Sequence, residues 1–404
     1  MLAKRSVLLL SLSVIALLVI GFVMLASASF YTAKGQVDDY SMVIRQGVSL
    51  LASLGVCIAL AMMNYERLLR WRWYFFGIAV ITLILCYVPS VGVEKNGARR
   101  WIGLQSLGME GARVQPSEFA KMVLVIVLAA WFAKHEQFAR TFGKGFVVPT
   151  ALLLLFAGLI GGEMDLGSAT ITAFLGMGMM IVAGTRLRFI PLIGVVTLGA
   201  LAVMVWITPN RMYRVYGFAS ELPVISQFID LSKLPEKEQK EIAAKQRQQQ
   251  HAALAFGSGS VGGVGPGQGR VKMYSLAEAQ TDFILPLVGE ELGLRGTLVA
   301  VFAFVMIVIC GMCIAAYAPN RFGKLLGFGL TLLIGLEGLM NMGVTTGVFP
   351  NKGLPLPFVS YGGSSLLVAM ASIGILINIH RQGVHLNQAD LPVIRRKNRW
   401  TPQV

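Results

Sequence analysis

A short cluster of ionisable residues offers chemistry on an anion. Arg113 precedes Pro116, and Glu118 and Lys121 follow on one face of the helix expected at 117–133. Inside a membrane such groups are costly, so each is a functional candidate unless a neighbour neutralises it. Two interpretations stay open. Glu118 and Lys121 neutralise each other, or Arg113 and Lys121 join the helix N-terminal amides in binding a phosphate or pyrophosphate.

A single acid, Asp282, stands where a polar stretch gives way to an apolar one. Partial desolvation at such an edge raises the pKa of a carboxyl toward what a general base needs. An N-cap role for Asp282 is an equally good interpretation. The stretch before it, residues 255–270 (AFGSGSVGGVGPGQGR), lacks the Gly-Lys-Ser/Thr ending of a nucleotide-binding loop and is otherwise typical of a flexible linker.

A third cluster, residues 349–365 (FPNKGLPLPFVSYGGSS), contains three prolines and three glycines. Continuous helix is excluded there, so we expect a turn that lines a cavity or re-enters the bundle, where protein or water satisfies its backbone. Glu337 and Asn341 lie four residues apart in the preceding apolar run and point one helix face toward the same interior. We expect them to bond neighbouring helices rather than to line a cavity.

The composition sets these clusters in a membrane. Of 404 residues 55% are hydrophobic and only 14% are charged, and the mean hydropathy is +0.68, whereas soluble domains carry about 25% charge. The net charge of +15 would suggest nucleic acid in a soluble protein, but the Lys and Arg residues fall in short clusters between apolar runs. All four cysteines lie inside apolar runs, which favours neither disulfides nor a metal site.

The elements that must position the clusters are transmembrane helices. A span needs roughly 20 apolar residues, and the sequence predicts an all-α integral membrane protein with about ten spans. The eighth contains Glu290, Glu291 and Arg295, so we expect a membrane-entry segment followed by a full span. The predicted spans are 7–30, 42–63, 73–93, 117–133, 145–162, 166–183, 189–208, 283–318, 325–349 and 363–380.

The distribution of cations predicts the orientation. Lys and Arg residues concentrate on one side of the predicted spans, which places both termini in the cytoplasm, including a basic tail at 381–404. The first span is expected to be a retained signal anchor. Residues 94–116 and a long loop at 209–282 then lie outside, and 234–250 within that loop is expected to form a solvated helix starting at Pro235. Residues 1–404 are expected to form one polytopic domain.

Six stretches of this sequence resemble the SEDS family of shape, elongation, division and sporulation proteins. They stand in the family's order and span most of the chain, and two of them, 96–101 and 352–353, are more similar to the division member of the family than to its elongation member. The stretches are 96–104 (NGARRWIGL), 115–121 (QPSEFAK), 165–169 (DLGSA), 255–260 (AFGSGS), 278–293 (EAQTDFILPLVGEELG) and 352–365 (KGLPLPFVSYGGSS).

The resemblance implies a peptidoglycan glycosyltransferase of the bacterial cytoplasmic membrane that polymerises lipid II at the outer face, in septal wall synthesis during cell division. It implies Asp282 as the catalytic residue, with a candidate substrate-binding set of Arg113, Gln115, Glu118, Lys121, Lys352, Ser364 and Ser365. It also implies a class B penicillin-binding protein as partner, beside other divisome or elongasome membrane proteins and membrane lipids. No cofactor is required by the sequence, although a divalent cation is compatible with a pyrophosphate leaving group, and no nucleic acid partner is expected.

Three positions depart from the family pattern: Gln280 replaces the usual His, Ala277 the usual Pro before Glu278, and Met164 the usual Pro before Asp165. Two other functions stay open at this stage. Polar groups inside a helical bundle also suit a lipid II flippase or transporter, and the altered surroundings of Asp282 suit a non-catalytic division scaffold. Clusters on one side of the membrane and the lack of obvious inverted repeats favour surface chemistry.

Overall fold

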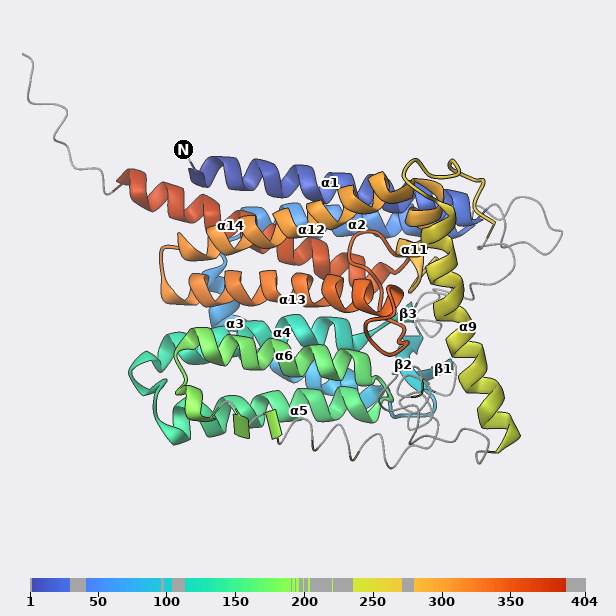
Figure 1. The fold of residues 1–404 in the computed structure, drawn as a ribbon. Coiled ribbons are helices and arrows are strands. Elements are labelled where there is room, and N and C mark those ends of the chain that lie inside the picture. The colour runs from blue at the N-terminus through green and yellow to red at the C-terminus, as the bar shows by residue number, and fades with distance from the viewer. Residues whose placement is uncertain are drawn as a thin grey trace, which may run out of the picture.

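The protein is a bundle of long apolar helices with a small sheet at one end (Figure 1). The computed structural model describes residues 2–29, 41–95, 98–103, 113–189, 191–192, 194–195, 199, 203, 220, 235–270 and 280–389. Its helices and strands are α1 (Leu2–Ser29), α2 (Ser41–Met62), α3 (Glu66–Leu85), β1 (Gly92–Lys95), β2 (Ala98–Gly103), β3 (Arg113–Val114), α4 (Pro116–Lys134), η2 (Glu136–Phe138), η3 (Gly143–Val147), α5 (Val148–Gly162), α6 (Leu166–Ala183), η4 (Leu187–Phe189), α9 (Glu236–Ser258), α11 (Ile284–Glu291), α12 (Gly293–Ala316), α13 (Arg321–Thr345) and α14 (Gly363–Ala389).

Nine helices within the described part of the chain are long and apolar enough to cross a membrane, which supports a multi-pass membrane protein. They correspond to nine of the ten predicted spans, and the predicted eighth span is divided at Leu292 into the short α11 and the full-length α12. The predicted seventh span, 189–208, lies mostly outside the described residues, as do most of the long loop from 209, Ala277 and the end of the basic tail.

Two boundaries differ from those predicted. The helix α3 begins at Glu66 rather than near residue 73, because its Arg- and Trp-rich first turns are good helix formers that suit a membrane interface. The loop helix α9 continues to Ser258, past the predicted end at Gln250, and Pro235 is its N-cap rather than its first residue. Both helices nevertheless form where the sequence predicted them.

The centre of the bundle is α4. This helix packs against α3, α5, α6, α13 and α14, and most of its residues are buried. By contrast α1, α2 and α3 expose many large apolar side chains, as expected for helices that face lipid. The core position of α4 explains why a charged residue such as Lys121 on it needs partners.

A three-stranded antiparallel sheet precedes α4, in the order β1-β2-β3. The all-α expectation holds for the bundle but did not include this sheet, because the strands are short and lie in a polar connecting segment. At the same end of the bundle lie α9, α11 and the proline-rich loop, residues 349–362, whereas the N-terminus lies at the opposite end (Figure 1). We call the end that carries the strands the sheet end.

Candidate active site at the sheet end

Lys121 lies in a buried ionic triad rather than at an open surface. Its ammonium is 2.8 Å from Glu118 Oε1 on the same helix and 2.5 Å from Glu337 Oε1 on α13. The side chain of Lys121 is 1% exposed, and Glu118 is 2% exposed. Of the two sequence interpretations, the geometry favours neutralisation, with Glu337 as a second partner that the sequence did not assign to Lys121.

The backbone carbonyls of Gln280, Thr281 and Asp282 are all bonded, in the turn that leads into α11. The carbonyl of Gln280 accepts from the Tyr361 amide at 2.9 Å, and that of Thr281 accepts from the Ser360 hydroxyl. The carbonyl of Asp282 itself accepts from Asn341 Nδ2 at 2.9 Å. Two of the three donors belong to the proline-rich loop, so this loop holds the turn that carries the candidate base.

Asn341 connects the two halves of the site. Its Nδ2 also donates to the Leu354 carbonyl at 2.6 Å, and Asn341 stands one helical turn after Glu337 on α13. One turn of α13 therefore fixes both Lys121 and Asp282. The expected bonding to a neighbouring helix is confirmed for Glu337, whereas Asn341 bonds a turn and a loop instead of a helix.

The Asp282 side chain is half-buried and packs against the proline-rich loop. A Cβ added to Gly353 would lie 2.3 Å from Asp282 Oδ2, so the carboxylate rests on the glycine Cα. The N-cap of α11 is Phe283, one residue after Asp282. The N-cap interpretation of Asp282 is therefore wrong by one position, and the residue is partly exposed.

Gln115 brings the first turns of three helices together. Its backbone amide donates to Ser364 Oγ on α14 at 3.1 Å. Its side-chain Nε2 donates at 3.3 Å to Oδ2 of Asp165, the N-cap residue of α6. Gln115 is itself the N-cap of α4. The positive ends of three helix dipoles thus meet at the sheet end, where they favour an anion.

The remaining predicted residues lie at the same end with differing exposure. Arg113 is exposed on β3, where it pairs with Gly103 of β2. Lys352 is half-buried, whereas Ser365 is buried in the first turn of α14. The structure therefore places the whole predicted set at the sheet end, but Glu118 and Lys121 lie beneath its surface.

A second acidic pair, which the sequence did not single out, lies where α5 meets α6. Burial would raise the pKa of Asp165. The charge of Arg100, two hydrogen bonds donated by Ser168, and the charge of Lys352 together outweigh burial and hold the pKa below its ordinary value. Glu163 is 2% exposed, and neither of its carboxylate oxygens has a hydrogen-bond partner among the described residues. Burial raises the pKa of Glu163 to about 8, with Asp165 adding to the rise and Cys86 and Arg100 opposing it.

The glycine-rich segment is not a free linker. Its first residues end α9, and the rest folds around the adjacent carboxylates of α11. Glu291 Oε2 accepts from the Gly267 amide at 2.9 Å, and Glu290 Oε1 accepts from the Arg270 amide at 2.7 Å. The Ser27 hydroxyl on α1 donates to Glu291 at 2.7 Å. Glycines allow this close approach, and the buried acids hold the segment in place.

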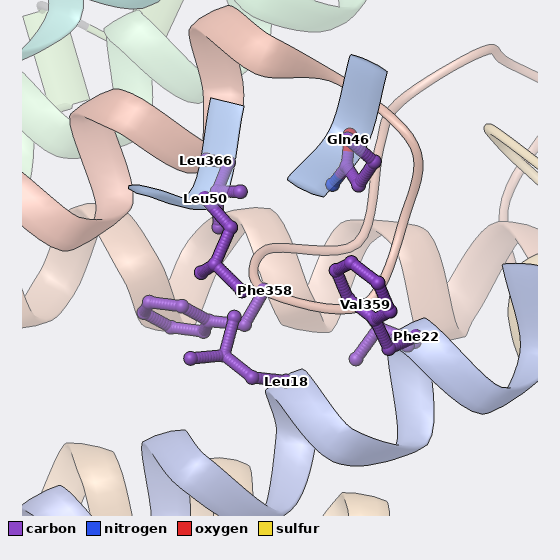
Figure 2. Close-up of a pocket in the computed structure, with 8 residues that line it drawn as sticks. Leu18, Phe22, Gln46, Leu50, Phe358, Val359 and Leu366 are labelled. Carbon is purple, nitrogen blue, oxygen red and sulfur yellow. The ribbon is translucent and has the colours of Figure 1, made fainter. Parts of the chain in front are cut away.

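Gln46 on α2 is a supporting residue that sequence reasoning missed. Its Nε2 donates to the Ser360 carbonyl at 3.4 Å, and its Oε1 accepts from the Gly362 backbone amide at 3.3 Å. The two bonds hold the proline-rich loop against α2. Figure 2 shows the loop at this point, with Phe358 next to Leu18 and Leu50 in a shallow pocket. A polar Gln within the predicted span 42–63 was the available signal.

The arrangement combines a carboxylate at an accessible edge with cations and helix N-termini nearby. Such a site can take a proton from a hydroxyl and stabilise a departing anion. Within the described residues no three metal-ligating side chains come together.

A family model described as "Cell cycle protein", which covers FtsW, RodA and SpoVE, matches residues 8–385. The chain is 35% identical over 382 residues to the probable peptidoglycan glycosyltransferase FtsW of Geobacter metallireducens, covering 93% of this chain and 95% of that one. The protein of the same name from Pseudomonas fluorescens is also 35% identical over 382 residues, covering 93% of this chain and 88% of that one.

Solved structures are similar over nearly the whole length. One is a chain of a peptidoglycan synthase complex, described for its structural coordination of polymerization and crosslinking, with a TM-score of 0.68 and 26% identity over 93% of this chain and 97% of that chain. Another is a variant of the rod shape determining protein RodA of Thermus thermophilus, with a TM-score of 0.65 and 25% identity over 92% of this chain and 96% of that chain.

Proposed function

Because the chain belongs to the FtsW, RodA and SpoVE family of cell cycle proteins, we propose that it is a peptidoglycan glycosyltransferase that polymerises lipid II, in septal wall synthesis during cell division. The observation that carries this proposal is the half-buried Asp282, fixed at the sheet end by three consecutive carbonyl hydrogen bonds. Relatives that share about a third of its residues over nearly their whole length carry the name peptidoglycan glycosyltransferase.

Asp282 is the proposed general base. Its carboxylate takes the proton from the acceptor sugar hydroxyl as the oxygen of that group attacks the anomeric carbon of the donor sugar. A new glycosidic C–O bond forms, the C–O bond to pyrophosphate breaks, and undecaprenyl pyrophosphate departs with the bonding electrons. Because glycine has no side chain, the Asp282 carboxylate can pack directly against the Gly353 backbone.

The departing pyrophosphate needs positive charge. Arg113 and Lys352 supply it at the surface, together with the N-terminal turns of α4 and α14, where Gln115, Ser364 and Ser365 stand. Lys121 and Glu118 lie below this surface, and their proposed contribution is to hold α4 against α13 so that the first turn of α4 keeps its place.

The same proposal gives the orientation in the membrane. The sheet end faces outward from the bacterial cytoplasmic membrane, where lipid-linked precursors are polymerised, and both chain termini face the cytoplasm. A class B penicillin-binding protein is the proposed partner for crosslinking. The likeness to a chain of a peptidoglycan synthase complex supports this pairing.

The test is polymerisation of purified lipid II by the reconstituted protein, with and without a cognate class B penicillin-binding protein. Wild type is expected to form glycan strands, and Asp282→Ala and Asp282→Asn are expected to form none while inserting and folding normally. Full activity of Asp282→Asn would remove Asp282 from the mechanism. Lipid II translocation by a polymerisation-inactive wild type would instead support a flippase.

A further inference from the structure

The base would act only if its carboxylate pointed at the acceptor, and the structure shows what fixes its direction. We infer that Gly353 and Asn341 are positioning residues for the Asp282 carboxylate, an inference that rests on the proposed function of Asp282. Gly353 lets the carboxylate pack closely because it has no side chain, and Asn341 holds the backbone carbonyl of Asp282 by a hydrogen bond. Neither residue was predicted in a site role.

The Gly353 contact leaves no room for a side chain. A Cβ at this position would lie 2.3 Å from Asp282 Oδ2 and 3.2 Å from its Cγ. Atoms of real side chains do not approach so closely, so one of the two residues would have to move. Gly353 itself is exposed. An added methyl group would therefore displace the carboxylate at the surface that a substrate would reach, and disturb the buried core little.

Asn341 holds the two backbone segments that carry Asp282 and Gly353. Its Nδ2 group bridges the carbonyl of Asp282, at 2.9 Å, and the carbonyl of Leu354, at 2.6 Å. Leu354 follows Gly353 directly, so one amide group sets the spacing between the backbone that carries the carboxylate and the glycine against which it rests. Asn341 is 1% exposed, and its side chain cannot turn away without breaking the bonds to a buried and a part-buried carbonyl.

The loop offers a matched control. Gly362 lies in the same loop, and a Cβ added there meets nothing closer than Ser365 Cβ at 3.9 Å. Gly362→Ala therefore makes the same chemical change in the same loop without a clash. Any effect of Gly353→Ala that Gly362→Ala lacks comes from the Asp282 contact.

The experiment measures lipid II polymerisation by the full chain with its penicillin-binding protein partner. Gly353→Ala is expected to lower kcat by roughly 10- to 100-fold, as small displacements of catalytic groups do. KM for lipid II should stay unchanged, because the cationic surface is untouched. Gly362→Ala should match wild type. Asn341→Asp, which replaces the donor by an acceptor of the same size, should lower kcat in the same way, and Asn341→Gln should recover part of the loss.

Thermal unfolding separates positioning from misfolding. If Gly353→Ala destabilises the protein, the double variant Asp282→Ala/Gly353→Ala should recover that stability, because the carboxylate that the methyl group meets is gone. A folded Gly353→Ala with wild-type kcat would overturn the inference, as would a loss of stability that Asp282→Ala does not relieve. Polymerisation by Asp282→Ala alone would instead overturn the proposed function, so the two failures are distinguishable.

Discussion

The ammonium of Lys121 on α4 and the carboxylate of Glu337 on α13 form an ion pair of 2.5 Å inside the bundle. Glu118 shares the same ammonium at 2.8 Å. The triad thus holds two carboxylates and one cation in a place that water hardly reaches, and it lies one turn of α13 from Asn341, which holds Asp282. The same face of α13 therefore holds α4 in the bundle and the backbone of the candidate base.

This geometry predicts unequal effects of removing the triad's members. Lys121→Ala leaves two buried carboxylates without a cation, and breaking a buried pair in this way typically costs about 3–5 kcal/mol. Glu337→Gln leaves one cation with one carboxylate, so it should cost clearly less. Thermal unfolding in detergent checks this order. A Lys121→Ala protein as stable as wild type would contradict a structural role for the triad.

Glu163 predicts a dependence of stability on pH. Its pKa is raised to about 8 in the folded chain, whereas an unfolded Glu titrates near 4.3. Between about pH 4.3 and 8 the unfolded chain has lost this proton and the folded chain keeps it, so the free energy of unfolding falls as pH rises through this window. Glu163→Gln should flatten this fall and be more stable than wild type near pH 8. Unfolding curves at pH 5, 6.5 and 8 measure the slope, and equal slopes would contradict the prediction.

The backbone conformation of Met164 predicts that proline would destabilise this position. Its φ is +66°, which a proline ring cannot adopt and which glycine adopts freely. Met164→Pro should therefore destabilise this protein, although relatives usually carry Pro there, and Met164→Gly should be neutral or stabilising by up to about 1 kcal/mol. Thermal unfolding of both variants checks the pair, and a stabilising Pro would show that the turn has another conformation.

Arg113 predicts a defect in substrate binding without a defect in folding. The side chain is exposed on β3, so Arg113→Ala should leave thermal stability unchanged while raising KM for lipid II or lowering kcat/KM, with a weaker dependence on salt. Arg99→Ala is the matched control, because Arg99 is an exposed cation of the same sheet that pairs with Glu94. Equal effects of the two variants would indicate general attraction of charge instead of a site.

The hydrogen bonds of Glu291 predict that its carboxylate holds the glycine-rich segment in place. Glu291→Gln keeps the size of the side chain but weakens its acceptance from Ser27 and the Gly267 amide. The segment 259–270 should then be cleaved faster by added protease than in wild type. Ser27→Ala removes the bonds of the Ser27 hydroxyl, including the one that it accepts from the Gly267 amide, but leaves that amide bonded to Glu291, and should have a smaller effect. Unchanged cleavage of both variants would show that other contacts suffice.

The sequence predicted most of the bundle because spans are read from length and hydropathy, and a backbone in lipid must be helical. The motif clusters likewise predicted that the candidate residues gather at one end of the bundle. The sheet was missed because its strands are two to six residues long, too short for a periodic pattern. Glu163 was missed because a carboxylate at the end of a span resembles an ordinary loop acid until its burial is known.

Composition and spacing alone identify a helical membrane protein with acids and cations at the ends of spans, because local composition decides what enters a bilayer. Tertiary structure alone decided which of those charges meet. Lys121 and Glu337 are 216 residues apart, and Asn341 and Gly353 approach Asp282 from another helix and a separate loop. Spacing places residues on one face of one helix, but the partner of a buried charge is chosen by packing, since only a nearby opposite charge or donor offsets the cost of leaving water.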